Sequence, residues 1–182
     1  MRHNTKITLP PYSTLKKYEG NGNWAIAKYY RFPWSFFYRH KLKMMVAMMP
    51  EKIQYNILDL GCGPGIFTTE LKKHGLRIKN VDKVEGVDPN WKFDIVVCGS
   101  YLEFVNLEHV LFIINKVLNP GGLLIVASPM ENIFTKLYFN ICRSTKRRKS
   151  HKTIFWSVSE HFNILEHKTW LGLYFSLKAQ KR

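Results

Sequence analysis

Short apolar runs alternate along the chain with segments whose apolar residues recur at helical spacing. A run that is apolar throughout predicts a strand buried on both faces, as in a parallel sheet. Strands are expected at residues 57–60, 77–82, 93–99 and 123–128, followed by a final pair at 161–167 and 171–179. Helices are expected at 66–74, 107–118 and 133–141, and residues 24–49 should form two helices divided by Pro33.

Strands that alternate with helices predict an α/β fold, in which a mostly parallel sheet lies between two helical layers as a three-layer sandwich. The tightly connected final pair predicts an antiparallel C-terminal edge. We expect residues 1–23 to form an N-terminal arm and residues 24–182 to form a single domain. Within that domain, residues 24–50 are expected to be a helical lead-in or lid.

Composition narrows the class of protein. The chain has 182 residues, of which 46% are hydrophobic, enough for one domain with a real core. It contains no run of 18 apolar residues, so no transmembrane helix is expected. The start lacks a secretory leader pattern, and the cysteines, three in number and widely spaced, argue against a disulfide framework and a metal site. A cytoplasmic protein is expected.

The formal net charge of +15 predicts an anionic partner, which would be nucleic acid, anionic lipid headgroups or a phosphate-bearing small molecule. A basic surface without a specific partner is the alternative. Aromatic residues between positions 24 and 43 are interleaved with Lys28, Arg31, Arg39, Lys41 and Lys43. This segment is expected to pack against the domain, to form a lid over a substrate or to lie on an anionic membrane surface. The run K-R-R-K at 146–149 is expected to be a solvated loop or a phosphate site.

A glycine-rich loop follows the first expected strand, where residues 56–65 read N-I-L-D-L-G-C-G-P-G. Glycines in this pattern let the backbone approach a ligand closely. A dinucleotide-binding loop would carry its third glycine where Ile66 stands. The carboxylate of Asp59 would repel a pyrophosphate and suits a ligand with an ammonium group. The loop therefore favours a ligand other than a dinucleotide.

D-L-G-C-G-P-G resembles the first motif of class I S-adenosylmethionine-dependent methyltransferases. F-D-I-V-V-C-G-S-Y-L-E-F-V and L-N-P-G-G-L-L-I-V-A-S-P resemble the fourth-strand and fifth-strand segments of that family, in the family's order. W-S-F-F-Y-R-H-K-L-K resembles the lead-in of its type 11 small-molecule group. The resemblance covers roughly residues 24–182. It implies a Rossmann-like fold, S-adenosyl-L-methionine as cofactor, and methyl transfer to a small-molecule or lipid-like acceptor.

The resemblance also implies which residues touch the cofactor. Asp59 would support the loop and favour the cofactor's ammonium group, and an acidic residue after the second strand would accept both ribose hydroxyls. The complete set implied is Asp59, Gly61, Cys62, Gly63, Gly65, Asp82, Asp88, Gly99, Ser100 and Tyr101. Tyr101 is expected to stack on adenine, to close the site or to pack in the core.

Two carboxylates compete for the ribose. The segment V-E-G-V-D-P-N resembles the end of the family's second strand, which favours Asp88. Asp82 lies 21 residues after Gly61, close to the roughly 20 residues that separate such a loop from its acidic residue, which favours Asp82. The chain must return across the sheet before the strand that begins at Phe93, which requires about 17–20 Å along the strands. The four residues after Asp88 reach only about 14 Å, whereas the ten after Asp82 reach about 35 Å. We therefore prefer Asp82 for the ribose and place Asp88 near the adenine ring.

The same ten residues mark a departure from the family, because a full member has a helix, a third strand and a loop there. We expect the fold to be abbreviated after the second strand, with a short extended piece at Val84–Val87 at most, and with weaker cofactor affinity. The stretch from Lys149 to His161 is also short for the family's usual loop and helix.

The sequence does not decide whether a side chain acts as a general base. Methyl transfer needs a general base only if the acceptor is protonated. Glu103 and His109 are weak candidates for it, and their ordinary roles would be a turn cap and a helix surface. Relatives often carry histidine where Phe104 stands, which argues mildly against a base there.

Two other functions stay in competition with a small-molecule methyltransferase. The abbreviated middle favours a binding module without catalysis. The charge favours a nucleic-acid methyltransferase, against which G-S-Y-L stands after the fourth strand in place of an N/D-P-P-Y/F motif.

Overall fold

The computed structural model describes residues 7–18, 26–32, 34–51, 54–132, 135 and 149–182. Six strands form one sheet in the order β2-β1-β3-β4-β6-β5. Their bounds are β1 Tyr55–Leu60, β2 Gly75–Val81, β3 Phe93–Gly99, β4 Leu118–Pro129, β5 Phe162–Trp170 and β6 Tyr174–Lys181. The pairs β1/β2, β1/β3 and β3/β4 are parallel, and β6 pairs antiparallel with both β4 and β5. This confirms the mostly parallel sheet with an antiparallel C-terminal pair.

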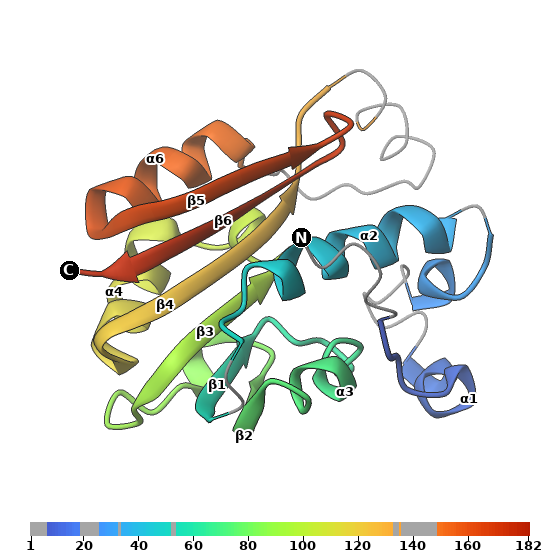
Figure 1. Cartoon of the computed structure of the whole chain (residues 1–182), viewed down its shortest axis with the longest axis horizontal. Helices are drawn as coiled ribbons and strands as arrows, with labels where there is room; N and C mark the ends of the chain where they lie inside the picture. Colours follow the sequence, from blue (N-terminus) through green and yellow to red (C-terminus); the bar gives the residue numbers. More distant parts are fainter. Residues whose placement is uncertain (1–6, 19–25, 33, 52–53, 133–134, 136–148) are drawn as a thin grey trace.

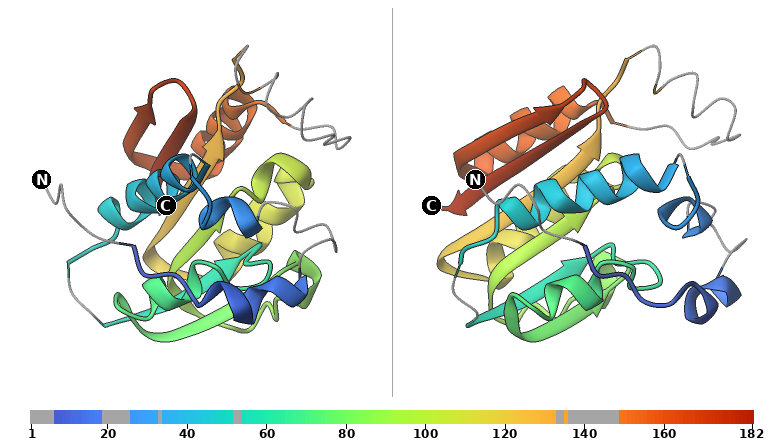
Figure 2. Two further views of the ribbon diagram at one scale, coloured as in Figure 1. Left: turned by 90° about the vertical axis from the view of Figure 1, so that its right-hand side faces the viewer. Right: turned by 45° about the vertical axis from the view of Figure 1, so that its right-hand side comes forward.

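Helices cover both faces of the sheet and complete a three-layer sandwich (Figures 1 and 2). One face carries α2 Trp34–Ala47 and the short α3 Thr68–Leu71, and the other carries α4 Leu107–Val117 and α6 His151–His161. Shorter turns are α1 Tyr12–Leu15, η1 Lys16–Tyr18, η2 Ile26–Tyr29, η3 Val84–Gly86 and η4 Leu102–Phe104. Side chains of Asn106 and Ser150 cap the first turns of α4 and α6 by accepting a backbone N–H.

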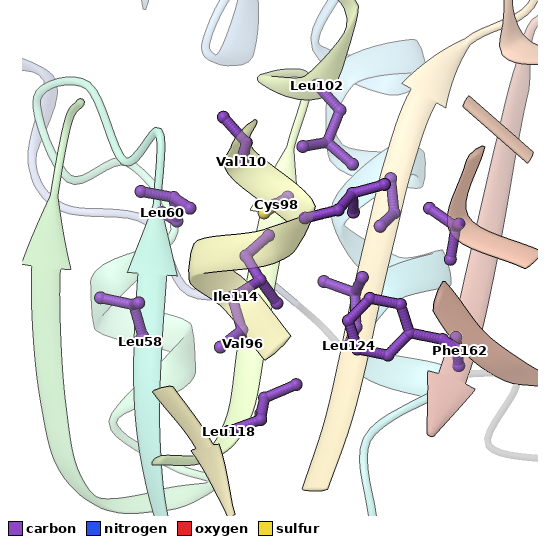
Figure 3. Packing of buried hydrophobic residues seen from close by; sticks show 14 of the residues in the cluster. Leu58, Leu60, Val96, Cys98, Leu102, Val110, Ile114, Leu118, Leu124 and Phe162 are labelled. Atoms are coloured by element: carbon purple, nitrogen blue, oxygen red, sulfur yellow. The ribbon is translucent and has the colours of Figure 1, made fainter. Parts of the chain in front are cut away.

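The core consists of two apolar clusters, one on each face of the sheet, because successive strand residues point to opposite faces. Leu58 and Leu60 of β1 pack with Val96 and Cys98 of β3 under Ile114 of α4 (Figure 3). The alternate residues of the same strands, such as Ile57 and Val97, pack under α2. The alternation also directs Asp59 to the face that α2 covers.

The abbreviated middle is confirmed. Within the part of the chain that the structure describes, β2 is the edge of the sheet, and no strand pairs with its outer side. The chain returns from Val81 to Phe93 through the single 3-10 turn η3. The loss of the third strand is therefore confirmed between Val81 and Phe93, and the alternative of a short extended piece at Val84–Val87 is wrong. A turn suits this connection because Val84 and Val87 are buried there against the core.

Several boundaries differ from the expected ones. The helix after the glycine loop is only four residues long, and Gly75 begins β2 instead of capping that helix, since a side chain there would meet Ile57 and the carbonyl of Tyr55. The N-terminal arm packs on the domain through the buried Ile7 and Leu15. The expected first helix of the lead-in is the four-residue turn η2, and Pro33 lies outside the described residues.

Near the C-terminus, the stretch from Lys149 to His161 holds an eleven-residue helix, so it is not too short for one. The expected helix at 133–141 lies almost wholly outside the described residues, as does most of K-R-R-K, of which Lys149 alone is described.

Candidate functional site

The glycine loop leaves β1 at the carboxyl edge of the sheet and is fixed to the end of β2. Gly61, Gly63 and Gly65 have φ values of 77°, 53° and 77°, in the left-handed region where a side chain is strained. The N–H groups of Gly61 and Cys62 donate to the carbonyl oxygen of Val81 at 2.8 and 3.4 Å. The next N–H, that of Gly63, donates to Oδ1 of Asp82 at 3.0 Å. These bonds hold the loop in one conformation.

Of the two competing carboxylates, the structure brings Asp82 to the loop and not Asp88. Asp82 follows directly after β2. Asp88 is exposed, and its Oδ1 accepts the N–H of Asn90 within its own turn. A carboxylate has about four acceptor sites, so Asp82 keeps acceptor capacity beyond its bond to Gly63. The assignment of the ribose to Asp82 stays a prediction.

Asp59 is a buried carboxylate beside a buried cation. Its side chain is almost wholly inaccessible, and among the described residues Oδ2 has no hydrogen-bond partner. Burial raises the pKa of Asp59 to about 7, and the positive charge of Lys41 opposes that rise. A buried polar atom without a partner is costly, so Oδ2 is a ready acceptor for a ligand's donor.

Lys41 was missed as a site residue because the sequence groups it with surface cations of the lead-in. It is only 3% exposed, and its Nζ donates to Tyr29 Oη and Ser100 Oγ, both at 3.0 Å. The signal was present in the spacing, since Lys41 lies on the same helical face as the buried Tyr38 and Met45. The expectation that Lys41 lies on a membrane surface is wrong.

The residues after β3 close over the glycine loop. Ser100 has a φ of 64°, unusual for a residue with a side chain, and its N–H donates to Ala127 at 2.7 Å. The ring of Tyr101 packs on Gly61, where an added Cβ would lie 2.4 Å from Tyr101 Cγ. The Tyr101 hydroxyl accepts the N–H of Val84 at 2.9 Å. Of its three expected roles, packing in the core is confirmed, because Tyr101 packs on the apolar cluster as well as on the loop, and the other two stay predictions.

The two weak candidates for a base occupy other positions. Glu103 is 2% exposed, its Oε2 accepts the hydroxyl of Ser128 at 2.9 Å, and its carbonyl accepts the N–H of Lys149. It therefore ties the segment after β3 to the end of β4. His109 is exposed on α4, and its backbone N–H is capped by Asn106.

The cysteine of the loop is not a nucleophile at neutral pH. Burial, followed by the charges of Asp59 and Asp82, raises the pKa of the Cys62 thiol to about 12. Burial likewise raises the pKa of Cys98 well above its usual value. A thiol with so high a pKa stays protonated and reacts poorly. Within the described ranges, no three His, Cys, Asp or Glu residues are grouped to hold a metal ion.

These residues fit a ligand that carries an amino acid and a sugar diol. The unpartnered oxygen of Asp59 suits an ammonium group, and Lys41 beside it suits a carboxylate. Asp82, at the adjacent strand end, suits two neighbouring hydroxyls. S-adenosylmethionine has all three of these groups.

Among the described helices, none is long and apolar enough to cross a membrane.

The sequence of residues 23–172 matches the family described as Methyltransferase domain. No curated protein matches the chain in sequence.

Solved structures share the fold at low sequence identity. N-methyltransferase NodS from Bradyrhizobium japonicum, in complex with S-adenosyl-L-homocysteine, is 15% identical with a TM-score of 0.67, over 93% of this chain and 96% of that chain. An S-adenosylmethionine-dependent methyltransferase from Mesorhizobium loti is 14% identical with a TM-score of 0.60, over 76% and 96%. Geranyl diphosphate C-methyltransferase from Streptomyces coelicolor is 8% identical with a TM-score of 0.59, over 79% and 76%.

Proposed function

Because the chain belongs to the methyltransferase domain family, we propose that it transfers the methyl group of S-adenosylmethionine to a small-molecule or lipid-like acceptor. One observation carries the proposal. Asp59, whose buried Oδ2 has no partner among the described residues, lies near the carboxyl end of β1, and the buried ammonium of Lys41 reaches Ser100 just after β3. This is the edge where α/β sheets bind ligands. A buried pair of this kind matches the zwitterionic end of the cofactor.

The proposed roles follow from the contacts of each residue. Asp59 holds the cofactor's ammonium group, and Lys41 holds its carboxylate. Gly61, Gly63 and Gly65 shape the loop along which it lies, and Asp82 accepts the ribose hydroxyls while anchoring Gly63. Gly99, Ser100 and Tyr101 line the opposite side, where Ser100 also orients Lys41. Asp88 is assigned to the adenine end.

The bound cofactor supplies a methyl group on a sulfonium, which a lone pair of the acceptor displaces in line. The chain's own contribution is positioning, since orientation can supply much of the rate enhancement of a bimolecular transfer. Asp59 and Lys41 fix one end of the cofactor and Asp82 fixes the sugar, so the methyl group is held at one place. The carboxylate of Glu103 accepts a hydrogen bond from Ser128, so we do not propose Glu103 as a general base.

Titration calorimetry with S-adenosylhomocysteine tests the proposal. We expect saturable binding at one site, and methyl transfer from S-adenosylmethionine to members of a panel of amines, phenols and lipid-like alcohols. Neighbours named for methylation of nitrogen and of carbon share this fold, so the panel should span both kinds of acceptor. Absence of binding at millimolar ligand would overturn the proposal.

A binding module without catalysis is the second candidate, and one observation favours it. The connection from Val81 to Phe93 holds a single 3-10 turn, so less of the chain encloses the adenine end of a ligand. This candidate predicts that Asp82→Ala leaves the protein's function intact and that S-adenosylmethionine binds, if at all, without turnover.

Nucleic-acid methylation is the third candidate and rests on the net charge of +15. It predicts RNA or DNA binding that weakens steeply with salt and stimulates turnover. Nucleic acid that fails to bind, or that binds without being methylated, would exclude it.

A further inference from the structure

A group of large apolar side chains stands exposed beside the candidate site. Trp34, Phe36 and Leu171 expose 40%, 58% and 72% of their surface. With the half-buried Trp170, these four residues form what we call the aromatic rim. Each such side chain gains about 1.5–3 kcal/mol when it is removed from water completely, so the rim favours a partner that covers it.

The rim is one surface built from two distant segments. The ring of Trp170, at the end of β5, lies 5.6 Å from that of Phe36 on α2 and stacks on His40 at 3.9 Å. Phe36, His40 and Lys43 share one face of α2, because residues three and four apart on a helix are neighbours. The opposite face of α2 is buried against the sheet. The exposed face of α2 and the β5–β6 turn are therefore continuous.

The turn between β5 and β6 holds its leucine in an unfavourable conformation. Leu171 and Gly172 have φ values of 48° and 65°, and Leu173 N–H donates back to the carbonyl of Trp170 at 2.8 Å. A two-residue turn with both φ values positive favours Asn-Gly, and a leucine at its first position is strained. The chain thus keeps an exposed apolar residue at a place where a polar one would fold more easily. Such a local conflict points to a function for the side chain.

The charge on the α2 side of the rim is of one sign, whereas the exposed Glu131 lies beside the β5–β6 turn. Residues 20–50 contain five Lys and Arg and no Asp or Glu. Lys28 Nζ lies 5.7 Å from the centre of the Trp34 ring, and Arg31 and Lys43 are exposed. The exposed Trp156, by contrast, has Glu160 four residues along the same helix. The α2 side of the rim therefore complements an anionic partner.

The rim also adjoins the site. Met130 N–H, just after β4, donates to Leu173 at 2.9 Å, which places the β5–β6 turn at the carboxyl end of β4. Lys41 of α2 reaches Ser100 after β3. In Figures 1 and 2 the start of α2 and this turn project beyond the tips of β3 and β4. One helix thus contributes Lys41 to the site and Phe36 to the rim.

We infer that the aromatic rim docks this protein on an anionic lipid bilayer. Aromatic and leucine side chains enter the boundary between headgroups and acyl chains, where tryptophan is favoured, and the cations around them face the anionic headgroups. Docking would set the site at the membrane surface, where a lipid-like acceptor is concentrated. This last point rests on the proposed function, whereas the docking itself does not.

Co-sedimentation of the full chain with vesicles tests the inference. We expect binding to vesicles that mix phosphatidylglycerol with phosphatidylcholine, and much weaker binding to phosphatidylcholine alone. Leu171→Asn should weaken binding at least about fivefold while leaving the fold as stable or more so, because it removes an apolar contact and relieves the turn. Phe36→Ser should weaken it similarly, and Trp156→Ser, the same kind of change at an exposed aromatic residue of α6 outside the rim, should not.

Two results would overturn the inference. One is a chain that fails to bind anionic vesicles at low salt. The other is binding that Leu171→Asn and Phe36→Ser leave unchanged, which would assign the attraction to the overall charge of +15. Thermal unfolding of each variant reports on its fold. If the chain binds vesicles but not S-adenosylhomocysteine, the docking stands and the proposed function is rejected. If it binds S-adenosylhomocysteine but not vesicles, only the docking is rejected.

Discussion

The backbone N–H of Gly63 donates to Oδ1 of Asp82 at 3.0 Å, so the carboxylate that ends β2 is fixed against the loop that ends β1. The two residues come from neighbouring parallel strands, whose carboxyl ends meet at one edge of the sheet. This contact gives Asp82 a defined position before any ligand arrives. It also separates Asp82 from Asp88, which bonds only within its own turn in the described structure.

Replacing Asp82 with asparagine should weaken S-adenosylhomocysteine binding by about 10- to 100-fold, because a charged acceptor of two hydroxyls becomes a neutral one. The amide oxygen can still accept the Gly63 N–H, so thermal stability should change little. Calorimetry measures the affinity, and Asp88→Asn is the control. A larger loss from Asp88→Asn than from Asp82→Asn would transfer the ribose to Asp88.

Gly61→Ala should destabilise the fold by at least about 2 kcal/mol, since it combines a strained φ of 77° with a methyl group 2.4 Å from Tyr101 Cγ. Urea unfolding measures this loss. Gly121→Ala is the control, because its φ is 70° but the nearest atom is 3.7 Å away, so it should cost only about 1 kcal/mol.

The double variant Gly61→Ala with Tyr101→Ala separates the two causes. If the ring is the obstacle, the second change should recover part of the stability lost in the first, and the two losses should not add. Simple additivity would show that Tyr101 does not pack on the loop in solution.

Asp59 should make stability fall as the pH rises from about 4 to 7. Its pKa is about 7 in the folded protein against an ordinary value of 3.8, so the folded state binds the extra proton in this interval. Stability is then lost at up to about 1.4 kcal/mol per pH unit, with no further change from this residue above pH 7. Asp59→Asn should remove that slope. Urea unfolding of both proteins from pH 4 to 8 measures the difference, and parallel curves would contradict it.

Ligand affinity should change in the opposite direction. An ammonium group is held by the ionised form of Asp59, so binding of S-adenosylhomocysteine should tighten as the pH rises from about 5.5 to 7.5. An α-amino group itself titrates near pH 8, which sets the upper limit of this interval. Calorimetry in two buffers of different ionisation enthalpy would detect the proton released. Asp59→Asn should bind more weakly, without that pH dependence.

Lys41→Met should raise the pKa of Asp59 further and weaken ligand binding at least about tenfold, because the buried positive charge that favours the carboxylate is removed. Methionine keeps the length and apolar stem of the side chain, so the fold should survive. Lys43→Met is the matched control, since Lys43 is exposed two residues away. Equal effects of the two changes would assign them to net charge and not to the site.

The sequence by itself determined the order and type of most elements and the position of the loop. Apolar runs predicted the buried strands because the burial of a strand follows from its own residues, as the bounds of β3 show. The antiparallel pair β5 and β6 was predicted with bounds that differ by one to three residues. The reach of ten residues was enough to end the second strand near Asp82, since chain length limits geometry whatever the packing. The glycines and Asp59 predicted a ligand with an ammonium group for the same local reason, and this role of Asp59 stays a prediction.

Only the tertiary structure decided which residues meet across the fold. Lys41 joins Ser100, Tyr101 covers Gly61, and Phe36 meets Trp170, in each case through elements distant in sequence. The sequence pattern did not predict helix α6, because this helix buries few apolar residues and depends on its neighbours for stability. These contacts follow from how helices lie on the sheet, which depends on the packing of the whole chain and leaves little trace in a local pattern.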